Sequence, residues 1–272
     1  METEGVFMQY ALITGANSGL GKAVAETLLK DGFYVFVADI RHTIPFPRPN
    51  FIPITMDVSS SESVTRAFVL IQAKTKTLDL VANFAGIVTL GSLIEKDPEE
   101  MARIMNIGLI GTMRVNREAF PLVERAHGRF INVSSEYGLL PAVPFHSFYT
   151  ATKHAVEVYS DGLRKELLPF DVRVVLIRPG AFKTEMQQGV QAQFDGLVKN
   201  SHHYAEALKK MERMMVDELK RAKDPMLVAH LVMKIMKAKH PHRAYNINHS
   251  FKMKLIRCLP LWLQDRVFSI FY

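Results

Sequence analysis

The chemistry in this chain begins with a phenol and an amine one helical turn apart. Tyr149 and Lys153 are four residues apart in a segment with helical spacing, so both side chains lie on one helix face. The phenol of a free tyrosine has a pKa of about 10, and a nearby ammonium stabilises its phenolate. The pair therefore predicts a general acid–base in which Lys153 lowers the pKa of Tyr149. Alone, such a pair is more often an exposed aromatic beside a solvated lysine.

A glycine-rich turn indicates where a dinucleotide would bind. TGANSGLG at residues 14–21 stands between a strand-like and a helix-like run, and its glycines let the backbone approach a pyrophosphate. Asp39 ends the next strand-like run, where a carboxylate binds the adenosine ribose and repels a 2′-phosphate. Arg41, two residues further on, could instead bind a 2′-phosphate. The sequence therefore favours NAD(H) as the cofactor and leaves NADP(H) open.

A hydroxyl group completes the candidate site. Ser135 follows a strand-like run, and strand ends are where the nicotinamide would lie. A hydroxyl there can hydrogen-bond the substrate oxygen and hold it for hydride transfer. In isolation, Ser135 is better explained as a serine that ends a strand.

These groups need a scaffold of alternating strands and helices. Apolar, β-branched runs predict buried strands at residues 8–14, 34–39, 51–56, 80–83, 129–134 and 172–177. Helical spacing predicts helices at 20–30, 60–73, 99–125 (as one helix or two) and 149–168. This order predicts an α/β fold with one domain, a doubly wound parallel sheet flanked by helices.

Seven motifs in order resemble the short-chain dehydrogenase/reductase family over nearly the whole chain. They are TGANSGLG at 14–21, Asp57-Val58, NFAG at 83–86, MNIGLIGT at 105–112, NVSS at 132–135, YTATK at 149–153 and RPGAFKT at 178–184. The hydroxysteroid and retinol dehydrogenase branch is loosely the nearest. The resemblance implies a Rossmann-type fold and an NAD(P)-dependent oxidoreductase that interconverts a secondary alcohol and a ketone.

The resemblance also implies a role for each matched residue. Tyr149 would be the acid–base, Lys153 would assist it and bind the nicotinamide ribose, and Ser135 would orient the substrate. Asn106 would hold a water in a proton relay to Lys153, and Asp57 would contact the adenine beside the Val58 backbone. The implied cofactor contacts are Gly15, Asn17, Ser18, Gly19, Leu20, Gly21, Asp39, Arg41, Asp57, Val58, Asn83, Ala85, Gly86, Tyr149, Lys153, Pro179, Gly180 and Thr184.

The chain departs from the family pattern at two points. Phe84 stands where the family usually has a second asparagine, which affects packing beside the cofactor more than its binding. The spacing from Ser135 to Tyr149 is one residue longer than usual, which leaves Ser134 as an alternative to Ser135. Ser135 is preferred because it stands three residues before Gly138, as the family pattern has it.

The region at about 184–222 is predicted to be the substrate lid. Its methionines and aromatics suit a large apolar ligand, and a helical core face explains them equally well. We expect a lipophilic alcohol or ketone, such as a steroid, bile acid, retinoid or long-chain compound. The residues in question are Met186, Val190, Phe194, Leu197, Tyr204, Leu208, Met211, Met214 and Met215.

Positive charge is concentrated towards the C-terminus. Residues 199–272 hold 15 Lys and Arg against 6 Asp and Glu, whereas residues 1–198 hold 19 against 21. This division, without a nucleic-acid motif, argues against a nucleic-acid binder. A basic, apolar tail at 251–272 follows the predicted catalytic domain at 1–250. It could lie on a membrane surface, cover the substrate cleft or pack at a subunit interface.

Other features narrow the class of protein. A single cysteine, Cys258, excludes an internal disulfide, and the histidines are too scattered for a zinc site, so no metal is expected. No apolar run reaches the ~20 residues of a membrane span. The first strand starts too early for a signal peptide, so we expect a cytoplasmic protein, with membrane association through the tail left open.

The family resemblance suggests a homodimer or homotetramer through the helices around 105–125 and 149–168. Two other activities fit the same fold. One is a dehydratase or epimerase with a tightly bound cofactor, and the other is a non-catalytic nucleotide sensor.

Overall fold

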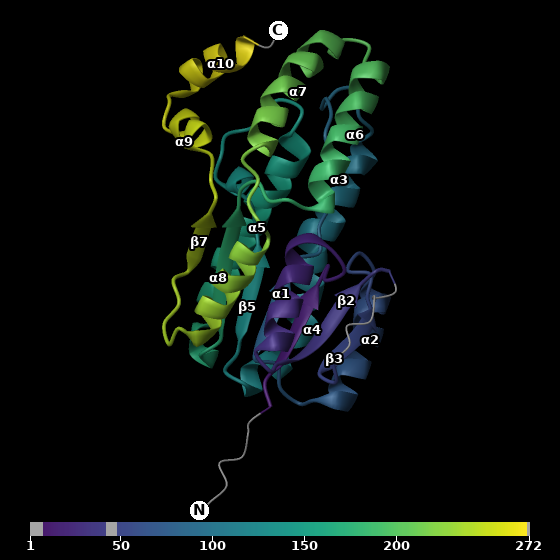
Figure 1. Cartoon of the computed structure of the whole chain (residues 1–272), viewed down its shortest axis with the longest axis vertical. Helices are drawn as coiled ribbons and strands as arrows, with labels where there is room; N and C mark the ends of the chain where they lie inside the picture. The colour runs from purple at the N-terminus through teal and green to yellow at the C-terminus, as the bar shows by residue number, and fades with distance from the viewer. Residues whose placement is uncertain (1–7, 42–47, 271–272) are drawn as a thin grey trace, which may run out of the picture.

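A seven-stranded parallel sheet forms the centre of the computed structural model, which describes residues 8–41 and 48–270 (Figure 1). The strand order β3-β2-β1-β4-β5-β6-β7 confirms the predicted doubly wound sheet. The strands are β1 (Tyr10–Thr14), β2 (Tyr34–Asp39), β3 (Phe51–Thr55), β4 (Leu80–Asn83), β5 (Arg129–Val133), β6 (Arg173–Pro179) and β7 (Ala244–Ile247).

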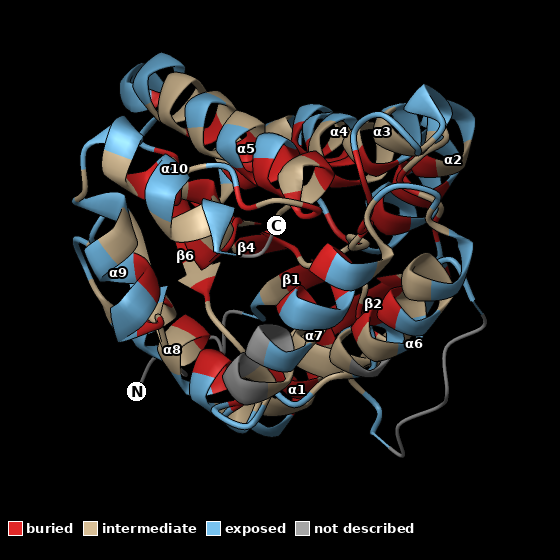
Figure 2. Ribbon diagram, turned by 90° about the horizontal axis from the view of Figure 1, so that it is seen from above, coloured by how far each residue is buried: buried red, intermediate tan, exposed pale blue. Residues whose placement is uncertain are grey.

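Helices cover both faces of the sheet. Figure 2 shows α4 (Gly111–Arg125) and α5 (Ser147–Glu166) on one side, and α1 (Gly19–Lys30) and α8 (Met226–Lys237) on the other. The first pair shares its side with α2 (Ser61–Lys74). Because both faces are covered, the central strands are apolar on both sides, as in Leu12 and Ile13 of β1, which are fully buried.

Strand order reverses at β1, which lies between β2 and β4. In this register Thr14 pairs with Ala38 on one side and with Asn83 on the other. A parallel sheet opens a crevice at such a point, outside the carboxyl ends of the strands. The fold therefore places the glycine turn, the end of β2 and the end of β4 around one crevice.

The predicted long helix at 99–125 is interrupted by one wide turn. It consists of α3 (Pro98–Met105), a π-helical turn (Asn106–Ile110) and α4. Glycines let this stretch lie close to its neighbours, because a Cβ on Gly108 would come 2.9 Å from Thr152 of α5, and one on Gly111 would come 2.8 Å from Val58. The interruption fits the observation that π-turns gather near functional sites.

Several elements lie beyond the sequence-based expectations. β7 and α8 were not predicted. The four residues of β7 give a weak strand signal, because Asn246 is polar and exposed and the other three are only partly buried. Pro53 sits inside β3, which tolerates it as an edge strand. Residues 1–7 and 271–272, at the ends of the predicted domain and tail, lie outside the described residues.

The lid and the tail gather at the end of the molecule where the strands finish (Figure 1). The lid comprises α6 (Glu185–Asn200) and α7 (Ala205–Leu219), and the tail comprises α9 (Phe251–Arg257) and α10 (Leu261–Ser269). Within the described ranges, no helix is long and apolar enough to span a bilayer. The boundary of the tail at residue 251 coincides with the start of α9, and its independence from the catalytic domain stays a prediction.

An asparagine network ties the sheet to α4 and α5. Asn132 of β5 accepts hydrogen bonds from Asn83 (2.9 Å) and Asn116 (3.2 Å), and it donates to Ser160 (3.0 Å). Asn116 also donates to the hydroxyl of Tyr159. Since these groups are buried, each needs a partner to offset its lost hydration.

We expect Asn132→Ala to lower the free energy of unfolding by about 3 kcal/mol, because it orphans several buried polar groups at once. Ser160→Ala removes one of the same bonds and should cost about 1 kcal/mol. Denaturant titration of both variants gives the comparison. Equal losses in the two variants would contradict a network centred on Asn132.

Candidate active site

The glycine turn has the shape that a phosphate-binding turn requires. Gly15 and Gly19 adopt φ of +63° and +54°, and a Cβ on Gly15 would come 2.8 Å from the backbone of Ala85. Among the described residues, no side chain caps α1 through Ser18, so the first N–H groups of α1 remain available. Thr184 lies against Gly19, so two residues predicted to contact the cofactor lie side by side here.

Asp39 is held against the glycine turn. Its carboxylate accepts from the backbone N–H groups of Asn17 (3.1 Å) and Arg41 (3.3 Å). The side chain of Asn17 in turn donates to the Arg41 carbonyl. The Arg41 side chain is exposed. The structure thus brings the carboxylate to the position expected for a ribose-binding acid.

Asp57 and Asn106 meet around Ser59. The Asp57 carboxylate accepts from the N–H and the hydroxyl of Ser59. The Asn106 amide donates to the Ser59 carbonyl (3.2 Å), and its oxygen accepts from Arg114 (2.8 Å). The side chain of Asn106 is therefore engaged near the predicted adenine contacts, and its water relay to Lys153 stays a prediction.

The NFAG segment divides between the core and the crevice. Asn83 was predicted to line the crevice, but it is buried and its amide belongs to the asparagine network. The Ala85 N–H donates to the Thr14 hydroxyl, and Phe84 packs against the Gly21 position. A Cβ on Gly86 would meet open space, whereas Ala85 packs against the core, so Gly86 is the part of the motif that borders open space.

The Ser135 hydroxyl lies near enough to the Tyr149 phenol to lower the pKa of that phenol, against the larger effect of burial. The Ser135 hydroxyl also donates to the Pro179 carbonyl (3.4 Å). The Ser134 hydroxyl donates instead to the Lys153 carbonyl. The geometry thus brings Ser135, rather than Ser134, to the phenol. Tyr149 remains partly exposed, so solvent can reach its side chain.

Lys153 approaches the ring of Tyr149 but is bound elsewhere. Its ammonium lies 5.6 Å from the ring centroid and donates to the Val133 carbonyl (2.9 Å). Burial lowers the pKa of Lys153 to about 8, and the charge of Glu157 opposes this shift. The amine therefore stays largely protonated at neutral pH.

The pKa of Tyr149 is raised to about 12, opposite to the direction that the sequence suggests. Burial is the largest cause, the hydrogen bond from Ser135 opposes it, and the charge of Glu136 adds to it. The expectation assumed that the ammonium outweighs burial. In this arrangement the lysine bonds to Val133, and the desolvation of the phenolate dominates.

Two carboxylates near the pair were missed by sequence reasoning. Glu157, one helical turn beyond Lys153, accepts two hydrogen bonds from Arg178, at 2.8 and 2.7 Å. Glu136 accepts from the N–H of Ser250, at the root of the tail. For Glu136, its position next to Ser135 is a sequence signal that could have suggested a role. For Glu157, the sequence gives no such signal, because its partner Arg178 lies 21 residues away.

His146 is a third residue that the sequence did not single out. It is buried, and its ring stacks on Tyr137, whose own ring meets Tyr149 edge to face. Burial lowers the pKa of His146 to about 4, so its imidazole is neutral at pH 7. Within the described part of the chain, its Nδ1 atom has no hydrogen-bond partner.

Beyond the glycine turn, the last sheet strands close the site. The Gly180 N–H donates to the Ile247 carbonyl (2.9 Å), and a Cβ on Gly180 would overlap the Asn248 carbonyl. Pro179 contacts Ser135 through its carbonyl. Thus β7, though unpredicted, fixes the position of the Pro179-Gly180 segment.

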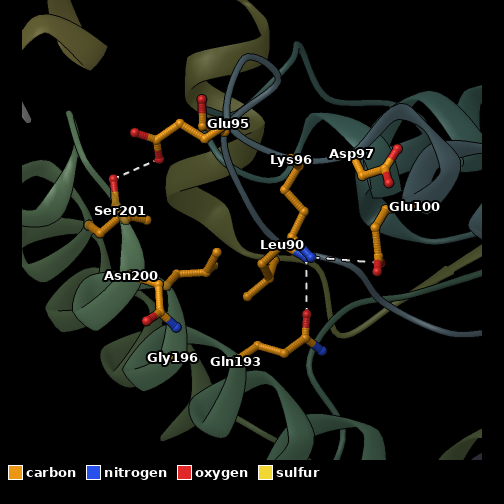
Figure 3. Close-up of a pocket in the computed structure, with 12 residues that line it drawn as sticks. Leu90, Glu95, Lys96, Asp97, Glu100, Gln193, Gly196, Asn200 and Ser201 are labelled. Carbon is orange, nitrogen blue, oxygen red and sulfur yellow. Dashed lines mark hydrogen bonds and ion pairs between the residues drawn. The ribbon is translucent and has the colours of Figure 1, made fainter.

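The lid is latched to the loop that follows β4. The Gln193 amide of α6 donates to the Val88 carbonyl and accepts from the Leu90 N–H. Glu95 accepts from the Ser201 hydroxyl at the turn between α6 and α7 (Figure 3). The cavity beside these residues measures about 430 Å³, and none of the four predicted catalytic residues lines it.

The apolar residues of the lid pack against protein. Val190, Phe194, Leu208 and Met211 are buried in a cluster, here called the lid cluster, with residues of the neighbouring loops and the tail. The other members include Leu90, Leu140, Val143, Phe145, Ala207 and Met253. Met186 is exposed, and the side chains of Met214 and Met215 lie outside the described part of the chain.

Comparison with known proteins supports this geometry. The model of the short chain dehydrogenase family matches residues 9–195. The chain is 30% identical over 237 residues to a 3-ketodihydrosphingosine reductase of Bacteroides thetaiotaomicron, covering 86% of this chain and 85% of the relative. It is 34% identical over 186 residues to the 17-beta-hydroxysteroid dehydrogenase type 6 of Mus musculus, covering 65% of this chain and 58% of the relative.

Solved structures share the fold. A short-chain dehydrogenase from Streptomyces avermitilis superposes with a TM-score of 0.75 at 22% identity, covering 97% of this chain and 93% of that one. A short chain dehydrogenase from Burkholderia cenocepacia in complex with NADP gives a TM-score of 0.73 at 23% identity, with 95% of each chain covered. Since the family model covers more than half of the sequence, the chain belongs to the short chain dehydrogenase family of NAD(P)-dependent oxidoreductases.

Proposed function

We propose that this protein reduces a lipophilic ketone to a secondary alcohol with NADH. The observation that carries the proposal is the approach of the Ser135 hydroxyl to the Tyr149 phenol, whose pKa it lowers against the larger effect of burial. Two hydroxyls at this place can hold one substrate oxygen between them. The bound nicotinamide would supply the hydride.

The protonation state of Tyr149 favours the direction of reduction. With its pKa raised to about 12, the phenol keeps its proton at neutral pH and can donate it to the oxygen of a ketone that receives a hydride. Oxidation of an alcohol would require the phenolate, which burial and the charge of Glu136 both disfavour. Lys153, protonated nearby, would bind the nicotinamide ribose.

Asp39 supports NAD(H) as the preferred cofactor. Its carboxylate is fastened to the glycine turn by the Asn17 N–H, so it would hydrogen-bond the ribose hydroxyls and repel a 2′-phosphate. Arg41 would favour the phosphate, but its side chain is exposed. The fixed carboxylate of Asp39 would therefore influence cofactor preference more than the exposed side chain of Arg41.

The lid cluster and the named relatives support a lipophilic substrate. The cluster brings Phe145, Val190, Phe194 and Met211 together above the strand ends, and an apolar ligand could take the place of some of these contacts. The relative of Bacteroides thetaiotaomicron is named for a ketone on a long-chain base, and the murine relative is named for a steroid. We propose a long-chain or polycyclic ketone on these grounds.

A substrate panel with absorbance of reduced nicotinamide as the readout tests the reaction. We expect turnover on long-chain 3-keto bases, steroids, bile acids or retinoids. Tyr149→Phe should lower kcat by at least about 10³-fold, because it removes the proton donor, and it should still bind NADH. Tyr10→Phe, which removes a hydroxyl at the start of β1, is the matched control and should stay active. Near-normal kcat in Tyr149→Phe would refute the role.

The same panel separates the rival activities. Turnover on small sugars alone would overturn the lipophilic substrate. Retention of NAD(H) through purification, with no net change in reduced nicotinamide during turnover, would instead indicate a dehydratase or epimerase. Binding of nicotinamide without turnover of any compound would indicate a sensor.

Asp39→Ala should shift the cofactor preference. Removing the carboxylate relieves the repulsion of a 2′-phosphate while Arg41 remains, so the ratio of kcat/KM for NADH to that for NADPH should fall at least about tenfold. The measurement compares both cofactors on the same ketone. A wild-type enzyme that prefers NADPH would contradict the assignment.

Glu136→Gln should move the pH dependence of alcohol oxidation. The charge of Glu136 raises the pKa of Tyr149, so its removal lowers that pKa. Because oxidation needs the phenolate, the rising limb of kcat/KM against pH should shift to lower pH in the variant. Glutamine can still accept from the Ser250 N–H. A limb that stays in place would show that Glu136 does not act on the phenol.

A further inference from the structure

The two tail helices present apolar side chains in two directions. Towards the body, Met253 is buried in the lid cluster, and Ile256 and Phe268 pack partly against it. Gln264 is also buried and donates to the Leu259 carbonyl. These contacts hold α9 and α10 on the protein, so their opposite sides are defined surfaces.

The outward side of the tail is apolar and cationic. Phe251, Leu255, Leu261 and Trp262 are 73%, 59%, 75% and 65% exposed. Basic side chains lie exposed among them. The outer tail face is defined as Phe251, Lys252, Lys254, Leu255, Arg257, Leu261, Trp262, Asp265 and Arg266.

The charge of this face is mostly positive. Residues 251–270 contain four basic side chains and one acidic side chain, Asp265. The positive charges of the tail also act on His249, just before α9. The pKa of His249 is lowered, first by burial and further by the charges of Lys254, Arg178 and Arg257, against a hydrogen bond to the Arg178 carbonyl. A partner that covers this face must therefore carry negative charge.

We propose that the outer tail face docks on the surface of an anionic lipid bilayer. The exposed aromatic and leucine side chains would enter the interface between head groups and acyl chains, and the lysines and arginines would meet the lipid phosphates. With 7 and 9 residues, α9 and α10 are too short to cross a bilayer. They would lie along it.

Charge favours a bilayer over a second copy of this chain. A twofold interface between copies would bring the same patch of each subunit together, and therefore cation against cation. A bilayer that contains acidic lipids offers the opposite charge and an apolar layer at once. A lone tryptophan beside basic side chains is also typical of residues that settle at membrane interfaces.

Docking would bring the bilayer close to the entrance of the site. The tail lies at the same end of the molecule as the lid (Figure 1), and Met253 is part of the lid cluster. Ser250, just before α9, donates to Glu136 beside Ser135. A lipophilic compound in the bilayer would thus lie near the lid, although the docking itself does not depend on the proposed substrate.

The chain carries its own reporter for this test, because Trp262 is its only tryptophan. We expect its fluorescence to shift to shorter wavelength with vesicles of phosphatidylglycerol and phosphatidylcholine, and the protein to float with them. Pure phosphatidylcholine vesicles should bind at least about tenfold more weakly, and added salt should weaken the anionic binding.

Two sets of variants separate the apolar and the ionic contributions. Leu255→Glu should weaken vesicle binding at least about tenfold, whereas Leu70→Glu, on α2 at a matching 58% exposure, should not. Replacing Lys252, Lys254 and Arg257 by glutamine should weaken binding about a hundredfold. The same change at Lys30, Lys74 and Lys76, exposed on the body, should have little effect.

Each other outcome overturns the proposal. An unshifted Trp262 spectrum with anionic vesicles would refute docking, as would equal losses in the tail and body variants. If Leu255→Glu instead dissociated an oligomer in sedimentation while vesicle binding was absent, the face would be a subunit interface. Binding of NADH by every variant checks that the folded body is intact.

Discussion

Desolvation of the Tyr149 phenol and the Lys153 amine in one place is the constraint on which the site depends. Desolvation disfavours the charged form of each, so it raises the pKa of the phenol and lowers that of the amine. The hydrogen bond from Ser135 opposes the first shift, and the charge of Glu157 opposes the second. Glu157 is itself held by Arg178 of β6. The protonation of the pair is therefore set jointly by α5 and the strands beside it.

The sheet makes this arrangement possible by bringing distant segments to one edge. The ends of β1 and β2 carry the glycine turn and Asp39, and the ends of β5 and β6 carry Ser135 and Pro179. The buried asparagine network fixes β4 and β5 against α4 and α5. Since α5 carries Tyr149 and Lys153, the network also fixes the acid–base pair relative to the crevice.

Sequence reasoning succeeded where a local pattern has one structural meaning. Apolar runs that alternate with helical spacing identified six of the strands. It was wrong where residues distant in the sequence set the property of a side chain. The pKa of Tyr149 depends on where Lys153 bonds, and the orientation of Asn83 depends on Asn116 and Asn132. Such partners lie far apart in the chain, so the spacing of residues within a motif does not predict them. β7 was not predicted because it has four residues, three of them only partly buried and one exposed.

The region beyond residue 184 shows why apolar composition alone could not separate a core from a binding surface. Val190, Phe194 and Met211 could equally have faced a ligand, and the structure packs them against Phe145 and Met253. Hydrogen bonds of Gln193 and Glu95 also hold the lid to the loop that follows β4. On the tail, the same residue types stay exposed among cations. Burial on one side and exposure on the other distinguish a structural contact from a docking surface, and only coordinates supply that distinction.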